Sequence, residues 1–120
     1  MTDRRLKVAC AQLCSTTDPE RNVALVRDLV AEAAAKGAQL VGLPEVVNLM
    51  QVRRKEAVQV AHREADDPSL KAFREMAKEH GIWLHAGSLA LKLEDDERLT
   101  NRGFLIDPEG RIRGRYDKIH

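Results

Sequence analysis

One local pattern occurs twice in this chain and limits what it can fold into. An Asp-Pro pair is followed by apolar residues three and four positions apart, then by a glycine and an apolar run, over residues 18–37 and again over 67–81. Asp caps a helix N-terminus, Pro fits the first helical turn, and Gly adopts the left-handed conformation that ends a helix. The pattern predicts two amphipathic helices, over 19–36 and 68–80.

Apolar runs on both sides of the first helix complete a β-α-β unit. The runs cover residues 6–13 and 38–44, and two strands joined through a helix lie parallel in a sheet. We interpret 6–13 as a central strand, because both faces of such a strand are buried and its sequence is almost continuously apolar. A third strand is expected over 82–91, directly after the second helix.

The C-terminal quarter of the sequence has the pattern of a β-hairpin. Two runs with strand character, 99–107 and 111–119, are separated by the turn sequence "DPEG". An antiparallel pair is therefore expected there. Residues 46–66 show only blurred periodicity, and we expect a loop with an irregular helix.

Charge and length exclude several classes of protein. The 120 residues correspond to at most one small domain, and 20 Lys and Arg against 19 Asp and Glu give a net charge of +1. No basic cluster is available to follow a phosphate backbone, so we expect no nucleic-acid partner. The N-terminal residues 1–14 resemble neither a signal peptide nor a membrane span, so we expect no membrane association and a cytoplasmic location.

The cysteines do not indicate a metal site or a disulfide. Cys10 and Cys14 are the only two, and a bridge four residues apart along a strand has poor geometry. The four histidines lie at no recognisable ligand spacing. We interpret both cysteines as reduced, buried small side chains, and we expect no metal site.

Two charged residues come at the ends of strand patterns. Glu45 follows the apolar run 38–44, and Lys118 lies near the end of the last strand pattern. The carboxyl ends of parallel strands present side chains to ligands, so Glu45 is a candidate acid or base. Taken singly, each residue is more often a solvated charge than a functional group.

Four longer segments resemble the N-terminal half of the carbon–nitrogen hydrolase (nitrilase) superfamily. They are "VACAQL", "KGAQLVGLPEVV", "HAGSLAL" and "NRGFLIDPEGRIRGRYDKIH", and they occur in the family's order along essentially the whole chain. The last two are most similar to the branch of ω-amidases and deaminated-glutathione amidases. The resemblance implies an α/β fold, in which residues 1–120 form the N-terminal half of a nitrilase-type α-β-β-α sandwich, an incomplete carbon–nitrogen hydrolase domain.

The resemblance also implies a catalytic set of Glu, Lys and Cys. It assigns Glu45 as the general base and Lys118 as the cation beside the developing oxyanion. The family's nucleophilic cysteine lies downstream of the lysine, and there is no nucleophile in this chain, since Cys10 and Cys14 belong to the first strand and the turn after it. The implied function is hydrolysis of a non-peptide C–N bond, the side amide of a small ω-amido carboxylic acid, without a metal or an organic cofactor. The chain by itself is expected to be inactive.

An alternative is a non-catalytic α/β binding or assembly module that keeps the first half of the fold. A nucleotide-binding protein fits less well, because the turn after the first strand contains no glycine. The resemblance further implies homo-oligomers of the complete protein. It makes Asn101 a structural hydrogen-bonding residue and His120 a packing residue, and we assign Trp83 to the core.

Overall fold

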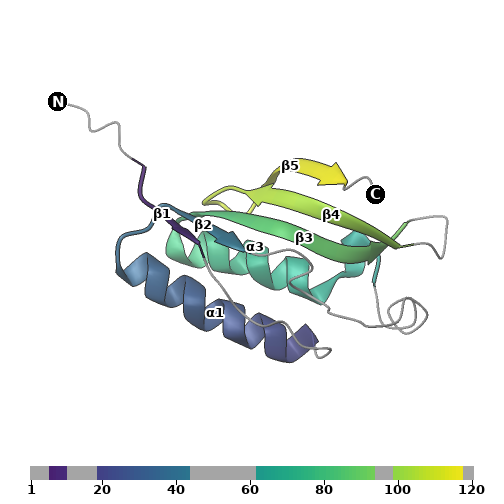
Figure 1. Ribbon diagram of the computed structural model, residues 1–120, viewed down its shortest axis with the longest axis horizontal. Coiled ribbons are helices and arrows are strands. Elements are labelled where there is room, and N and C mark those ends of the chain that lie inside the picture. The colour runs from purple at the N-terminus through teal and green to yellow at the C-terminus, as the bar shows by residue number, and fades with distance from the viewer. Residues whose placement is uncertain (1–5, 11–18, 44–61, 94–98, 118–120) are drawn as a thin grey trace.

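The computed structural model describes residues 6–10, 19–43, 62–93 and 99–117, which form one mixed sheet with helices beside it (Figure 1). The elements in chain order are β1 (Val8–Cys10), α1 (Pro19–Ala35), β2 (Leu40–Leu43), the 3₁₀ helix η1 (Glu64–Asp66), α3 (Pro68–His80), β3 (Trp83–Lys92), β4 (Leu99–Ile106) and β5 (Ile112–Asp117). The two helices, the parallel β-α-β unit and the hairpin expected from the sequence are all confirmed.

The strands of the described sheet follow one another in sequence order, β1-β2-β3-β4-β5. The pairs β1/β2 and β2/β3 are parallel, whereas β3/β4 and β4/β5 are antiparallel. Two antiparallel steps restore the original direction, so β5 runs the same way as β1, β2 and β3. This shared direction decides which edge of the sheet each strand end reaches.

The two ends of α3 are formed by the Asp-Pro pair and the glycine that predicted this helix from the sequence. The Asp67 carboxylate accepts a hydrogen bond of 2.8 Å from the Leu70 amide, Pro68 starts the helix, and Gly81 ends it with φ of 62°. Such a cap contributes about 1 kcal/mol to stability. These interactions join residues at most four positions apart, so they can be read from the sequence alone.

Both helices cover the same face of the sheet (Figure 1). The core lies between them and the strands, and its largest fully buried members include Phe73 and Met76 from α3 and Val26 and Val30 from α1. Alternate strand residues, such as Leu84 and Ala86 of β3, complete the core from the sheet side. Among the described residues no helix has the length and apolar character that crossing a membrane requires.

The opposite face of the sheet is not covered by these helices. Val8, Leu40 and Trp83 are register partners across β1, β2 and β3, and they share this face because paired residues of neighbouring strands point the same way. Val8 is 50% exposed and Trp83 is 36% exposed. We call these three residues the apolar row.

Three expectations about burial were wrong. The first strand is not central in the described sheet, because β1 pairs only with β2 and ends the strand order. Trp83 is not a core residue, because it points away from the helices. Cys10, expected to be buried, is an exposed free thiol, and Cys14 lies outside the described residues. The sequence showed that these strands are apolar but not which of their faces the helices cover.

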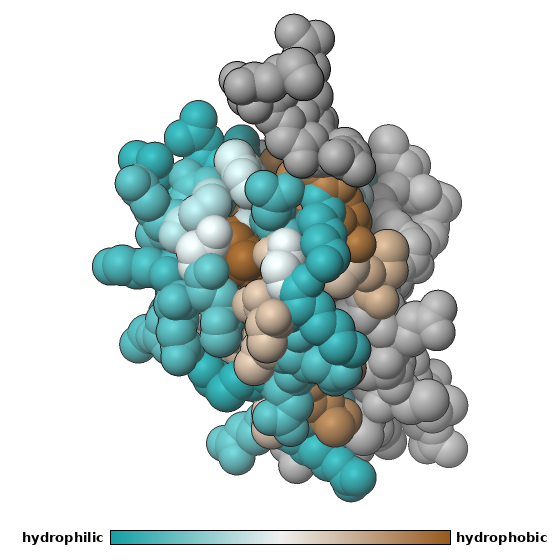
Figure 2. Space-filling model, turned by 90° about the vertical axis from the view of Figure 1, so that its left-hand side faces the viewer, coloured by the Kyte–Doolittle hydropathy of each residue, from teal (hydrophilic) through white to brown (hydrophobic). Residues whose placement is uncertain are grey.

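Figure 2 shows the end of the molecule that lies at the left of Figure 1. Hydrophilic residues cover most of the described surface in this view, and hydrophobic residues form a few separate patches. The exposed large hydrophobic residues of the described chain are Leu6, Val8, Trp83 and Tyr116. The apolar surface is therefore limited to a small number of side chains.

Candidate active site

The two predicted site residues follow the ends of two strands that run in the same direction. β2 ends at Leu43, two residues before Glu45, and β5 ends at Asp117, immediately before Lys118. Glu45 and Lys118 themselves lie outside the described residues, as does His120. Since β2 and β5 are codirectional, the chain leaves both strands at the same edge of the sheet.

The register shows how far each strand extends toward that edge. One row across the sheet contains Leu43, Ala86, Phe104 and Arg115. Glu45 comes two residues after Leu43, the β2 member of this row, and Lys118 comes three residues after Arg115, the β5 member. Three strand spacings of about 4.8 Å separate β2 from β5, so roughly 14 Å lie between their axes. Convergence of the two head groups on one substrate atom remains a prediction, and it needs long side chains or inward-bending segments.

Four charged residues meet where β4 begins and β5 ends. The Arg102 guanidinium donates from Nε and Nη2 to the two carboxylate oxygens of Asp117, at 2.6 and 3.1 Å, and from Nη1 to Glu64 at 3.2 Å. Arg115 Nε lies 3.0 and 3.1 Å from the two Glu64 oxygens. We call Glu64, Arg102, Arg115 and Asp117 the edge network.

The charges of the edge network reinforce one another. Burial alone would raise the pKa of Glu64, but hydrogen bonds from Arg115 and Arg102 outweigh it and hold this pKa below its ordinary value. The hydrogen bond from Arg102 likewise lowers the pKa of Asp117. The hydrogen bond to Asp117 is the largest cause of the raised pKa of Arg102. These shifts favour the ionised forms of Glu64, Arg102 and Asp117 at neutral pH.

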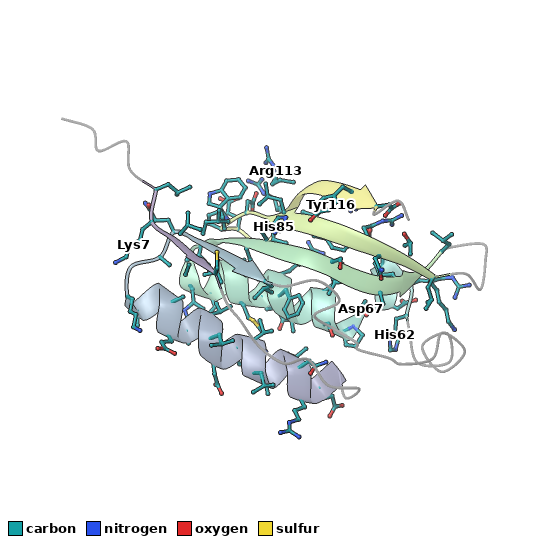
Figure 3. All side chains as sticks on the ribbon, viewed as in Figure 1. Lys7, His62, Asp67, His85, Arg113 and Tyr116 are labelled. Atoms are coloured by element: carbon teal, nitrogen blue, oxygen red, sulfur yellow. The ribbon has the colours of Figure 1, made fainter. Side chains whose placement is uncertain are left out.

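On the other face of the sheet, Tyr116 is fixed across two strands (Figure 3). Its hydroxyl donates to the Gly87 carbonyl oxygen at 2.9 Å and lies 3.1 Å from His85 Nε2 on β3. The Tyr116 and His85 rings are stacked, with centroids 6.0 Å apart and planes inclined by 15°. The Tyr116 ring lies over Gly103 of β4, where a Cβ atom would overlap it.

Sequence reasoning missed both arrangements. It assigned no role to Arg102, Arg115 and Asp117 of the hairpin and treated His85 as one of several scattered histidines, because the partners lie between 15 and 51 positions apart in the sequence. One available signal was Gly103, a glycine directly opposite Tyr116 in the hairpin register. Asn101 of β4 lies opposite Ala90 of β3, and its structural role stays a prediction.

A pocket of about 320 Å³ adjoins the edge network. Its lining consists of Glu64, Ala65, Lys92, Leu93 and Arg102. The Lys92 amide also donates to the His62 carbonyl oxygen at 2.9 Å, which attaches the segment before η1 to the end of β3. The described part of the chain contains no group of three or more His, Cys, Asp or Glu side chains that could hold a metal ion together.

Comparison with known proteins agrees with this architecture. The family model of the carbon-nitrogen hydrolases matches residues 7–120. The chain is similar to deaminated glutathione amidase of Yersinia enterocolitica, with 31% identity over 98% of this chain and 41% of that protein. It is also 29% identical to the chloroplastic omega-amidase of Arabidopsis thaliana, over 97% of this chain and 32% of the relative.

Solved structures show the same fold. The nitrilase and fragile histidine triad fusion protein NitFhit of Caenorhabditis elegans superposes with a TM-score of 0.85 at 30% identity, over 94% of this chain and 27% of that one. An amidase from Nesterenkonia sp. superposes with a TM-score of 0.79 at 26% identity, over 96% and 43% of the two chains. In a mutant of that amidase, acrylamide is attached at the active-site cysteine.

The sheet with helices on one face thus defines a mixed α/β protein of the nitrilase fold. The chain belongs to the carbon–nitrogen hydrolase family. It spans less than half the length of the relatives and solved structures compared above. Within the family, its relatives include the deaminated glutathione amidases and omega-amidases.

Proposed function

We propose that this chain supplies the base and the oxyanion-binding cation of an amidase that acts on small ω-amido carboxylic acids. The observation that carries the proposal is that β2 and β5 end at the same edge of the sheet, β2 two residues before Glu45 and β5 one residue before Lys118. Amidases among the relatives support the reaction class. The same relatives favour a side-chain amide of a small carboxylic acid as the substrate.

In the proposed reaction, Glu45 takes the proton of a cysteine thiol that lies outside this chain. The thiolate attacks the amide carbon, and the Lys118 ammonium stabilises the negative charge that develops on the carbonyl oxygen. The proton held by Glu45 then passes to the nitrogen, the C–N bond breaks, and ammonia leaves. Glu45 next takes a proton from water, which attacks the thioester, and the thiol and the free acid are released.

The nucleophile is not assigned to either cysteine of this chain. Cys10 is the last residue of β1 and Cys14 lies outside the described residues, and both precede Lys118, whereas the family resemblance implies a nucleophile after the lysine. We therefore propose that residues 1–120 alone do not hydrolyse amides. The complete protein is proposed to act in the cytoplasm on a free small molecule, as a homo-oligomer.

The test compares the 120-residue chain with a longer product of the same gene that includes a cysteine after His120. Ammonia release is measured from a panel of ω-amido acids. We expect turnover only from the longer protein, and a loss of about two or more orders of magnitude on Glu45→Gln or Lys118→Ala. Cys10→Ser serves as the matched control and should retain full turnover.

Circular dichroism and sedimentation on the same samples separate lost catalysis from lost folding. Turnover by a folded 1–120 chain that survives Lys118→Ala would overturn the proposal. A longer protein that folds but releases no ammonia from any amide would instead favour the alternative of a non-catalytic binding or assembly module.

A further inference from the structure

The end of β5 depends on side chains for its position. β5 is the last strand of the described sheet, so within that sheet it has a backbone ladder with β4 only. The last residue of an edge strand frays easily unless other contacts hold it. The final register pair of this ladder joins Asp117 to Arg102, and the next residue along the chain is Lys118.

The Arg102 side chain binds its register partner Asp117 and also Glu64. All three of its guanidinium nitrogens have a carboxylate partner, two on Asp117 and one on Glu64. The two-point contact with Asp117 fixes the orientation of the carboxylate as well as its distance, which a lysine could not do. Arg102 and Glu64 are each 25% exposed, so water competes only partly for these bonds.

Glu64 connects the strand end to the helical layer. It begins η1, which is followed at once by Asp67, the N-cap of α3. Glu64 also binds Arg115, two residues before Asp117 on β5. The edge network therefore links the start of α3 to two positions of β5 on the same face of the strand.

The residue between those two positions is held from the opposite face. Tyr116 donates to Gly87 and stacks on His85, both on β3. The last three residues of β5 thus each contact a partner outside their own strand. Ion pairs at partly exposed sites add little to global stability, so we expect the main effect of these contacts to be on the position of the strand end.

We propose that Arg102 is a positioning residue, which through Asp117 and Glu64 fixes the backbone from which Lys118 extends. The inference rests on the proposed function, in which Lys118 stabilises the oxyanion. A cation displaced by about 1 Å loses much of its effect on the transition state, while binding of the uncharged amide changes little.

The first experiment measures amide hydrogen exchange in the 120-residue chain and does not depend on catalysis. Arg102→Gln should raise the exchange rates of Asp117 and Lys118 by about tenfold or more and leave core amides such as Phe73 unchanged. Arg113→Gln, an exposed arginine of the same hairpin whose closest carboxylate contact is 3.7 Å, is the matched control. Unchanged exchange at Asp117 and Lys118 in Arg102→Gln would overturn the proposal.

The second experiment measures steady-state kinetics in the longer gene product. Arg102→Gln should lower kcat by about 10-fold to 100-fold with KM nearly unchanged, and Arg102→Lys should fall between it and the wild type. If Lys118→Ala abolishes turnover while Arg102→Gln keeps a wild-type kcat, the positioning role is wrong and the proposed function stands. If Lys118→Ala keeps its turnover, the proposed function fails instead, and the exchange result alone decides what Arg102 does. Should Arg102→Gln fail to fold by circular dichroism, Arg102→Lys replaces it in both experiments.

Discussion

Gly103 shows how a single residue determines the environment of the candidate site. It lies on β4 opposite Tyr116, and the absence of a side chain leaves room for the tyrosine ring to cross to β3. The Tyr116 hydroxyl can then reach Gly87 and His85. The position requires glycine because of this close approach.

We predict that Gly103→Ala displaces the Tyr116 ring without unfolding the chain. The added methyl group would overlap the end of a side chain that is 45% exposed and able to swing outward. The cost should be about 1 kcal/mol, the typical net value of a hydrogen bond. Urea unfolding and the chemical shifts of His85 are the measurements.

Gly114→Ala is the matched control for that prediction. Gly114 lies on the same hairpin, but its added Cβ would meet only Leu105 Cβ at 3.9 Å, which is an ordinary contact. A loss of stability equal to that of Gly103→Ala would show that the Tyr116 contact does not explain the effect.

At the level of elements, the β4–β5 turn is organised by one carboxylate. Asp107 Oδ1 accepts hydrogen bonds of 2.9 Å from the amides of Glu109 and Arg111, and Oδ2 lies 3.1 Å from Arg111 Nε. Gly110, with φ of 80°, completes the turn, and its carbonyl oxygen accepts a bond of 2.7 Å from Arg74 on α3. The sequence "DPEG" predicted the turn but not its attachment to the helix.

The turn should make stability depend on pH. Desolvation would raise the pKa of Asp107, but the two amide hydrogen bonds and Arg111 hold it below the ordinary value of 3.8. A carboxyl whose pKa is lower in the folded state contributes stability above its unfolded pKa and loses it as pH falls through the folded one. We predict that the urea midpoint falls between about pH 5 and pH 2, and that Asp107→Asn shows a smaller fall.

Asp107→Asn keeps a carbonyl oxygen for the two amide bonds but loses the charge and the acceptor of the Arg111 Nε bond. The variant therefore cannot titrate at this position. Other carboxylates with lowered pKa values, such as Glu64 and Asp117, are present in both proteins. The difference between the two curves of urea midpoint against pH therefore reports on Asp107. Parallel curves for the two proteins across this range would contradict the prediction.

For the whole molecule, the one-sided helical layer leaves the apolar row on the other face of the sheet. Val8 and Trp83 are both substantially exposed, although each is flanked in its strand by a more buried residue. Contiguous exposed apolar side chains on a sheet favour association with other copies. The 120-residue chain is therefore expected to self-associate.

We predict that the double variant Val8→Lys and Trp83→Lys shifts the sedimenting species of the 120-residue chain toward the monomer. Neither side chain belongs to the core cluster, so circular dichroism should stay unchanged. Glu79→Lys, on the exposed side of α3, is the control for added positive charge. Equal self-association of all three proteins would show that the apolar row is not the contact surface.

The amino-acid sequence by itself determined the elements whose signals are local. Caps, a turn and hydrophobic spacing gave α1, α3, β3 and the β4–β5 hairpin, because each signal joins residues only a few positions apart. Its resemblance to the carbon–nitrogen hydrolases was confirmed, whereas the roles of Glu45 and Lys118 remain predictions. Tertiary structure alone decided which face of each strand is buried, which leaves Trp83 exposed. It also brought Glu64 to Arg102, since charges 38 residues apart meet only when strand register and helix packing are set together.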